Sequence, residues 1–135
     1  MSISYGKGKK GTAGRLHAKI IRSLGSCEHC GSSTNLQCAH ILSRRFVATY
    51  TSLRNAFCLC ASCHRFFTDH PVKFGDFVRS TWANEYYEDI HKAAHKGAKT
   101  SDEFWEERIF FLKDIEARMQ EGELNIVEAR EYDND

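Results

Sequence analysis

The chain has 135 residues, which suits one domain with a modest hydrophobic core. It is 41% hydrophobic and 27% charged with a net charge of +1, and no apolar run approaches the roughly 18 residues that a membrane span requires. Because no apolar stretch follows the first lysines, we expect no secretory signal, and we expect a cytoplasmic protein with no membrane partner.

The first part of the chain is strongly basic. Residues 1–11 are rich in Gly, Lys and Ser, which predicts a flexible arm whose Lys7, Lys9 and Lys10 could contact a phosphate backbone. The first 22 residues hold six basic side chains and no acidic one, and the first hundred carry a net charge of +9. The alternative is that these lysines serve solubility alone. A short helix is expected next, over residues 12–24, with an apolar face formed by Leu16, Ile20 and Leu24.

Six cysteines in a chain expected in the reducing cytoplasm need an explanation other than disulfides. Two residues between cysteines allow one turn to present both sulfurs to the same ion, and two such pairs predict a closed structural zinc site. Buried free thiols or a redox pair are the alternatives. The four cysteines of the two pairs are Cys27, Cys30, Cys60 and Cys63.

The segment between the pairs predicts a strand, a polar loop and a second strand. Residues 36–41 and 56–59 are short apolar runs, and a helix is expected after the second. His40 lies at the end of the first strand, Asn55 at the start of the second, and His64 on the helix. Such a unit would bring the three side chains together on one side.

Two longer helices are expected in the second half of the chain. The first begins at Pro71, which suits a first helical turn, and ends at Gly97. The second covers residues 100–122 and begins with a capping box formed by Thr100 and Glu103. Their aromatic residues recur at helical spacing and are expected in the core.

Three stretches stand together in the middle of the chain: the run Leu36-Gln37-Cys38-Ala39-His40-Ile41, the single Asn55, and the run Leu59-Cys60-Ala61-Ser62-Cys63-His64. Together they resemble the HNH, or His-Me finger, endonuclease motif in its variant with two zinc-binding Cys-x-x-Cys pairs. The run His40-Ile41-Leu42-Ser43-Arg44-Arg45 is also similar to phage-borne HNH nucleases of the recombination type. The resemblance covers about residues 25–78, and the flanking helices carry none of it.

The resemblance implies roles for several residues. His40 would be the general base that activates water, Asn55 would orient or ligate, and His64 would bind a catalytic divalent metal such as Mg²⁺ or Mn²⁺. Arg44 and Arg45 would contact phosphate, with solvated loop charges as the alternative. His40 could instead be a structural histidine, and His64 a spare zinc ligand.

Two positions depart from the family pattern. Ala39 stands where many members have an acidic residue or histidine, and Thr68 where many have a second histidine. Asp69 and His70 lie nearby and could replace the missing metal ligand, although a capping role for His70 is equally compatible. The remaining histidines form no constellation and are expected on the surface: His17, His29, His91 and His95.

The expected fold is α+β, with a small ββα-metal core stapled by the four-cysteine zinc site and flanked by an N-terminal helix and two C-terminal helices. It forms a single domain over residues 12–122, with the motif core at 25–78 and a helical extension at 71–122. Residues 123–135 are expected as an acidic tail, since residues 101–135 hold twelve acidic and four basic side chains. This acidic part would shield the basic part or limit non-specific binding.

The sequence therefore predicts a zinc-stapled, metal-dependent endonuclease that acts on DNA. A homodimer or a phage or host DNA-processing partner would fit this function. The alternatives are a catalytically inactive, zinc-stabilised nucleic-acid-binding module and a protein-interaction module that uses the C-terminal helices.

Overall fold

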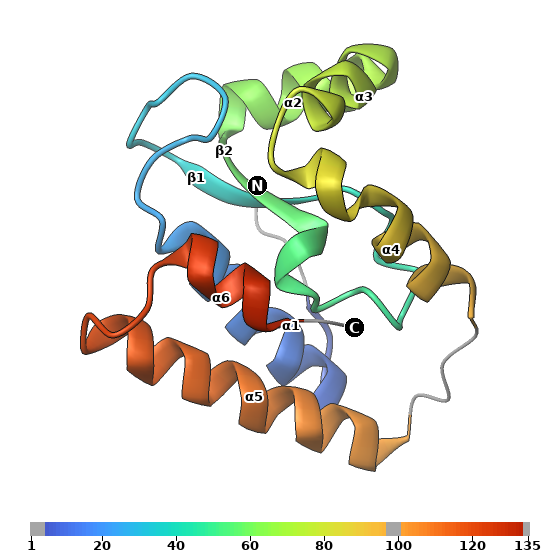
Figure 1. Ribbon diagram of the computed structural model, residues 1–135, viewed down its shortest axis with the longest axis vertical. Helices are drawn as coiled ribbons and strands as arrows, with labels where there is room; N and C mark the ends of the chain where they lie inside the picture. Colours follow the sequence, from blue (N-terminus) through green and yellow to red (C-terminus); the bar gives the residue numbers. More distant parts are fainter. Residues whose placement is uncertain (1–4, 97–100, 134–135) are drawn as a thin grey trace.

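The computed structural model describes residues 5–96 and 101–133 (Figure 1). Helices surround a two-stranded antiparallel sheet, which confirms the predicted α+β class. No helix in these two stretches is both long and apolar enough to cross a membrane. The elements are α1 Gly8–Arg22, β1 Leu36–His40, a 3-10 turn Leu53–Asn55, β2 Ala56–Cys60, α2 Ala61–Asp69, α3 Pro71–Arg79, α4 Ala83–His95, α5 Asp102–Gln120 and α6 Ile126–Tyr132.

The sheet separates two hydrophobic clusters. All five residues of β2 are buried, and from Ala56 to Leu59 successive residues enter different clusters because successive side chains of a strand point to opposite faces. Ala56 and Cys58 belong to the first cluster, and Phe57 and Leu59 to the second. Figure 1 accordingly shows α1, α5 and α6 on one side of the strands, and α2 and α3 on the other.

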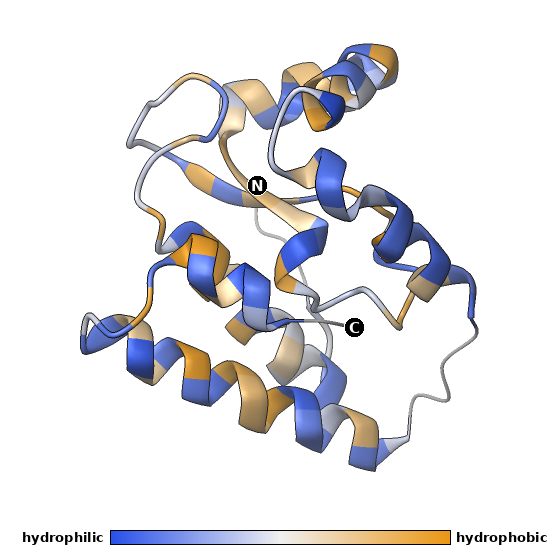
Figure 2. Cartoon of the chain, in the orientation of Figure 1, coloured by the Kyte–Doolittle hydropathy of each residue, from blue (hydrophilic) through white to orange (hydrophobic). Residues whose placement is uncertain are grey.

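The first cluster, between the sheet and α1, α5 and α6, is aliphatic, whereas the second, beneath α2 and α3, is rich in aromatic rings. In Figure 2, hydrophobic and hydrophilic residues alternate along α5, as expected for a helix with one buried face. The first cluster includes Ile20, Ile21, Leu53, Leu112 and Ile115. The second includes Phe67 and Val78, with Phe74, Phe77 and Trp82 packed against it.

The first helix begins earlier than the sequence predicts. α1 starts at Gly8, so Lys9 and Lys10, which we expected in a flexible arm over residues 1–11, are helical. The cause is tertiary packing, because α1 lies against α5 and the ammonium of Lys9 pairs with the carboxylate of Glu106 on that helix. The basic segment is therefore partly neutralised by the acidic one.

The long helix expected from Pro71 is broken into α3 and α4. At the break, the hydroxyl of Thr81 donates to the carbonyl of Val78 at 3.0 Å and accepts from the amide of Ala83 at 3.2 Å. A side chain that satisfies backbone groups locally competes with the helical ladder, which explains the break.

The predicted helix boundaries near residue 100 can be compared only in part. Gly97 and Thr100 lie outside the described residues. α5 begins at Asp102, and its N-cap is Ser101, whose hydroxyl accepts from the amide of Phe104 at 3.3 Å.

The C-terminal segment is folded, although its composition predicts an acidic tail over residues 123–135. α6 begins with a capping box in which the side chains of Asn125 and Glu128 each accept a hydrogen bond from the backbone amide of the other. Ile126 and Ala129 join the first hydrophobic cluster. The folded domain therefore continues beyond residue 122 to Asp133.

Candidate metal centre and histidine pocket

Four cysteine sulfurs meet where the turn before β1 approaches the junction of β2 and α2. All four Sγ atoms lie within 4.8 Å of one another, and Cys30 Sγ is 3.6 Å from Cys60 Sγ. In the first pair, the amide of Gly31 donates to the carbonyl of Cys27 at 2.9 Å and closes the turn. The structure thus brings the two Cys-x-x-Cys pairs together.

The cysteine cluster suits a structural metal such as zinc. A tetrahedral ion with Zn–S bonds of about 2.3 Å places its sulfurs about 3.8 Å apart; the Cys30–Cys60 separation of 3.6 Å is close to this value, and none of the sulfur separations exceeds 4.8 Å. Four cysteines are also the usual donor set of a closed structural site. With every ligand supplied by the protein, an ion here would hold the fold and would have no position for a substrate.

The surroundings of the cluster lower the pKa of the Cys27 thiol, whereas burial and the neighbouring sulfurs raise the pKa of the Cys63 thiol. Burial raises the pKa of the Cys27 thiol, but hydrogen bonds from the backbone amides of Cys30 and His29 outweigh it and bring the pKa to about 7. His29 also lies edge-on to the rings of Phe67 and Phe77, with its Nδ1 3.1 Å from Cys63 Sγ. An N–H at this nitrogen would stabilise the Cys63 thiolate from outside the ligand shell.

The predicted general base lies in a second site, a pocket of about 280 Å³. His40 Nε2 is 3.0 Å from the carbonyl oxygen of Tyr50, and because a carbonyl only accepts, Nε2 carries the proton and Nδ1 the lone pair. Burial, opposed by this hydrogen bond, lowers the pKa of His40 to about 4, so the imidazole is neutral at pH 7. The pocket, called the histidine pocket below, is lined by Tyr5, Cys38, His40, Ser43, Arg44 and His64.

His64 enters the histidine pocket from the first turn of α2. Its Nδ1 lies 2.7 Å from the side-chain oxygen of Gln37 on β1. Because that oxygen accepts, Nδ1 donates and Nε2 keeps its lone pair for a metal. Burial lowers the pKa of His64, which also favours the neutral, ligating form.

Asn55 holds the loop between the strands and does not line the histidine pocket. It is fully buried, its side-chain oxygen accepts from the amide of Leu42 at 2.8 Å, and its NH₂ group donates to the carbonyls of Leu42 and Thr49 at 3.2 and 3.0 Å. The loop that begins just after His40 is therefore tied to the start of β2. Asn55 thus fixes this loop from outside the pocket lining.

The two predicted phosphate-binding arginines are placed differently. Arg44 lines the histidine pocket, where its guanidinium could meet a phosphate beside the two imidazoles. Arg45 is exposed and its guanidinium lies 5.0 Å from the ring centre of Phe46, outside the residues that line the pocket.

The predicted DNA-binding lysines gather near the start of α1. All three are exposed, with Lys7 at the N-cap of the helix and the Lys10 ammonium 5.6 Å from the ring centre of Tyr50. Lys9 is ion-paired with α5 and is thus less available for a phosphate than Lys7 and Lys10.

The candidate substitute for the missing metal ligand is not in the pocket. His70 Nδ1 is 2.8 Å from the carbonyl oxygen of Phe66, and its ring stacks on the Phe66 ring between α2 and α3. Ala39 is buried in the second hydrophobic cluster, and the Thr68 hydroxyl donates to the carbonyl of His64 at 2.8 Å. No carboxylate occurs among the described residues that line the histidine pocket.

His17, which we expected on the surface, is fully buried beside the pocket. Its Nε2 lies 2.8 Å from the carbonyl oxygen of Ser52, its ring centre is 5.2 Å from that of His40, and burial lowers its pKa well below the usual value. The sequence held a signal, because Ala13, His17 and Ile20 fall on one helical face.

An arginine of α6 joins the cysteine turn to the start of β2. Arg130 Nη1 is 2.8 Å from a carboxylate oxygen of Glu28, which lies between Cys27 and Cys30. The same guanidinium donates to the carbonyls of Leu53 and Ala56 at 3.2 and 3.0 Å and lies 3.9 Å from the ring centre of Trp82. Both charged groups are almost fully buried.

A second buried ion pair, between Arg108 and Asp133, holds the end of the loop between the strands. This loop supplies the Ser52 and Tyr50 carbonyls that contact His17 and His40. The guanidinium of Arg108 on α5 forms two hydrogen bonds to the Asp133 carboxylate, at 3.0 and 2.9 Å. Arg108 also donates to the carbonyl of Thr51 at 2.6 Å, and Asp133 accepts from the amide of Leu53 at 2.8 Å. The C-terminal segment thus stabilises the back of the histidine pocket.

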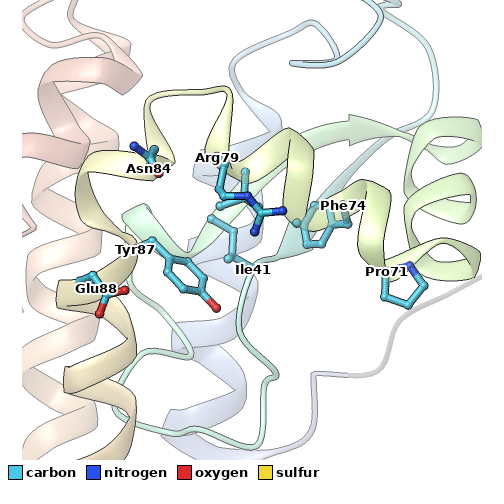
Figure 3. Close-up of a pocket in the computed structure, with 9 residues that line it drawn as sticks. Ile41, Pro71, Phe74, Arg79, Asn84, Tyr87 and Glu88 are labelled. Atoms are coloured by element: carbon cyan, nitrogen blue, oxygen red, sulfur yellow. The ribbon is translucent and has the colours of Figure 1, made fainter.

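Figure 3 shows a different cavity, of about 410 Å³, between α3, α4 and the residue after His40. The side chains of Ile41, Arg79 and Tyr87 converge there over Phe74. Among the described residues that line it, none is a histidine or a cysteine. It offers apolar and polar contacts but no proton-accepting imidazole.

Of the residues predicted for catalysis and phosphate contact, the histidine pocket brings together His40, His64 and Arg44, with Asn55 behind them. Arg45 and His70 lie elsewhere.

The chain matches no protein-family model, no curated protein and no solved structure.

Proposed function

We propose that the chain is a divalent-metal-dependent endonuclease that hydrolyses phosphodiester bonds of DNA, with His40 as the general base and His64 as a metal ligand. One observation carries the proposal: both imidazoles line one pocket, and each has one N–H held by an acceptor and a lone pair on its other nitrogen. One neutral imidazole can accept a proton from water while the other ligates a cation.

His40 is oriented for proton transfer by the backbone. The Tyr50 carbonyl fixes the Nε2–H, so Nδ1 would take the proton from the attacking water, and the same carbonyl would stabilise the imidazolium that forms. A base with a pKa of about 4 is weak in the free protein. The negative charge of a bound phosphate would raise the pKa of His40 toward neutrality and strengthen the base where it is needed.

His64 supplies one protein ligand for the catalytic metal. When bound, a divalent cation would neutralise charge on the phosphate and on the leaving oxygen. Since the pocket offers an imidazole and no carboxylate, phosphate oxygens and water would complete the ligand set, and we expect Mn²⁺ to support activity better than Mg²⁺.

The remaining residues bind and position the substrate. Arg44 would contact the phosphate, and the exposed Lys7 and Lys10 would contact the backbone of the same duplex. Cutting both strands usually needs a second active site, which a homodimer would supply. The cysteine cluster would hold the two strands and α2 in place through its zinc ion.

A catalytically inactive nucleic-acid-binding module is the second candidate. It is favoured by the two positions at which many family members carry a further metal ligand. Ala39 is buried in the second hydrophobic cluster, and the Thr68 hydroxyl donates to the carbonyl of His64 in its own helix. Neither position can supply the additional metal ligand. Binding without cleavage would identify this alternative.

A plasmid-nicking assay tests the proposal with Mg²⁺, Mn²⁺ and a chelator. We expect His40→Ala and His64→Ala to lose activity by about 100-fold or more while staying folded, since general base catalysis alone contributes about 10²–10⁴-fold. His70→Ala is the matched control, because His70 belongs to the end of the same helix but does not line the pocket. Cleavage that persists in the His40→Ala variant would refute the mechanism.

A further inference from the structure

A second group of metal-ligating side chains lies on the inner side of the histidine pocket. A ring nitrogen of His17, a ring nitrogen of His40 and the Sγ of Cys38 all lie within 4.8 Å of one another. We propose that these three side chains form a second metal site, distinct from the four-cysteine cluster, for a borderline-soft transition-metal ion such as Zn²⁺. One thiolate and two imidazoles are a donor set that Zn²⁺ favours.

The backbone orients both imidazoles for ligation. Nε2 of His17 lies 2.8 Å from the Ser52 carbonyl oxygen, and Nε2 of His40 lies 3.0 Å from that of Tyr50. Carbonyls only accept, so both Nε2 atoms carry protons and both rings present an Nδ1 lone pair. Metal-binding histidines usually have this arrangement, with the outer N–H donated to a backbone carbonyl or carboxylate.

The spacing of the donors fits an ion. His17 Nδ1 is 3.8 Å from Cys38 Sγ. With Zn–N bonds of about 2.0–2.1 Å and a Zn–S bond of about 2.3 Å, a tetrahedral ion places such a nitrogen and sulfur about 3.6 Å apart. Little movement is therefore needed to close these two ligands on a metal.

The three ligands come from firmly held elements, and the site has an entry path. His17 lies on the buried face of α1, while Cys38 and His40 lie two residues apart on β1 and both line the histidine pocket. In the metal-free protein, burial raises the pKa of Cys38 to about 12, and its protonated thiol faces His17 Nδ1. An ion that enters from the pocket would replace that proton and leave one coordination position toward the pocket.

Occupation of the second site has a consequence for the proposed endonuclease. His40 cannot hold this ion through Nδ1 and accept a proton from water at the same nitrogen. Zn²⁺ would therefore inhibit cleavage. This consequence depends on the proposed function, whereas metal binding at the site does not.

Cobalt titration tests the second site directly. The full chain is prepared with one equivalent of Zn²⁺, which fills the four-cysteine cluster, and Co²⁺ is then added as a spectroscopic probe. We expect one further equivalent to bind, with tetrahedral d–d absorption bands and a sulfur-to-cobalt charge-transfer band. Retention of the first zinc is checked by metal analysis.

Two variants, Cys38→Ala and His17→Gln, and one matched control, Cys58→Ala, test whether the added cobalt binds at the second site. Cys38→Ala should abolish the charge-transfer band, whereas Cys58→Ala should keep it, because Cys58 is a buried cysteine directly opposite Cys38 in the ladder but outside the group. His17→Gln retains a donor for the Ser52 carbonyl but loses the ring nitrogen, and we expect cobalt affinity to fall at least 10-fold. Circular dichroism confirms folding, and His17→Gln carries the test if Cys38→Ala does not fold.

The outcomes separate this site from the proposed function. A wild-type chain that binds no second equivalent, or a Cys38→Ala variant that binds cobalt as the wild type does, would overturn the second site. Cobalt binding that depends on Cys38 and His17 establishes the site even if the protein never cleaves DNA, in which case the proposed function falls alone. If it does cleave, added Zn²⁺ should inhibit the wild type and spare Cys38→Ala.

Discussion

The positive charge of Arg130 is expected to be costly to remove from this protein. Its guanidinium pairs with Glu28 inside the cysteine turn, and the side chains are only 4% and 12% exposed. Arg130→Met keeps most of the aliphatic volume and removes the charge. The Glu28 carboxylate then stays buried without its partner, and the carbonyls of Leu53 and Ala56 lose a donor.

Breaking a buried ion pair in this way costs about 3–5 kcal/mol of unfolding free energy. For a domain of this size, each kcal/mol lowers the melting temperature by about 3 °C, so the expected shift is roughly 10–15 °C. Arg118→Met is the matched control, since Arg118 also pairs with acidic residues in the C-terminal half but its side chain is 37% exposed. That substitution should cost about 0–1 kcal/mol.

Thermal and urea unfolding in saturating Zn²⁺ measure both variants. The unpaired carboxylate is the expected source of the loss, so Glu28→Gln should restore part of the stability of Arg130→Met when the two are combined. A cost for Arg130→Met as small as that for Arg118→Met would show that this pair is not desolvated as the structure indicates. A double variant no more stable than Arg130→Met would refute the electrostatic explanation.

Three further predictions concern the metal, the buried histidines and the loop. Chelation, or Cys60→Ser, should remove zinc and abolish cooperative thermal unfolding, since structural zinc contributes about 10–16 kcal/mol in small zinc domains; a melt unchanged by complete zinc loss, verified by native mass spectrometry, would contradict this. Because burial depresses the pKa of His17 and of His40, the unfolded chain binds protons first as the pH falls, so the contribution of these two histidines to stability should be constant above pH 6.5 and stability should decline toward pH 4, by up to about 1.4 kcal/mol per pH unit for each histidine. Urea unfolding at several pH values measures that slope. Stability that increases as the pH falls from 6.5 to 4 would refute the prediction. Asn55→Ala should cost about 2–4 kcal/mol in the same assay because it removes the three hydrogen bonds of a fully buried side chain and leaves the partly buried amide of Leu42 without an acceptor; a cost below 1 kcal/mol would show that the loop is held by other contacts.

The cysteine cluster and the two strands could be predicted because local spacing carries the information. Two residues between Cys27 and Cys30 already imply one turn and one ion, and the apolar run of β2 implies a buried strand. The convergence of His40 and His64 on one pocket follows from the order strand, loop, strand and helix. These features needed no knowledge of the distant parts of the chain.

What could not be predicted depends on long-range contacts or on backbone atoms. The acidic composition after residue 122 concealed α6, although Asn125 and Glu128 carried a capping-box signal at their spacing. The helical face shared with Ala13 and Ile20 indicates the burial of His17, but its hydrogen-bond partner, the carbonyl of Ser52, is a backbone group that no side-chain pattern reveals. The break between α3 and α4 likewise depends on one hydroxyl, that of Thr81.

The two ion pairs of the C-terminal segment have a consequence for biosynthesis. Glu28 and its partner Arg130 are 102 positions apart, and Asp133, which pairs with Arg108, lies 80 positions from Leu53, whose backbone amide donates to it. Ribosomes release the chain from its N-terminus, so every side chain of the histidine pocket emerges before either clamp can form, and contacts at such separation close slowly. A nascent chain therefore carries His40 on β1 and His64 on α2 before the loop between the strands is anchored, and the pocket becomes rigid only when α6 has been translated.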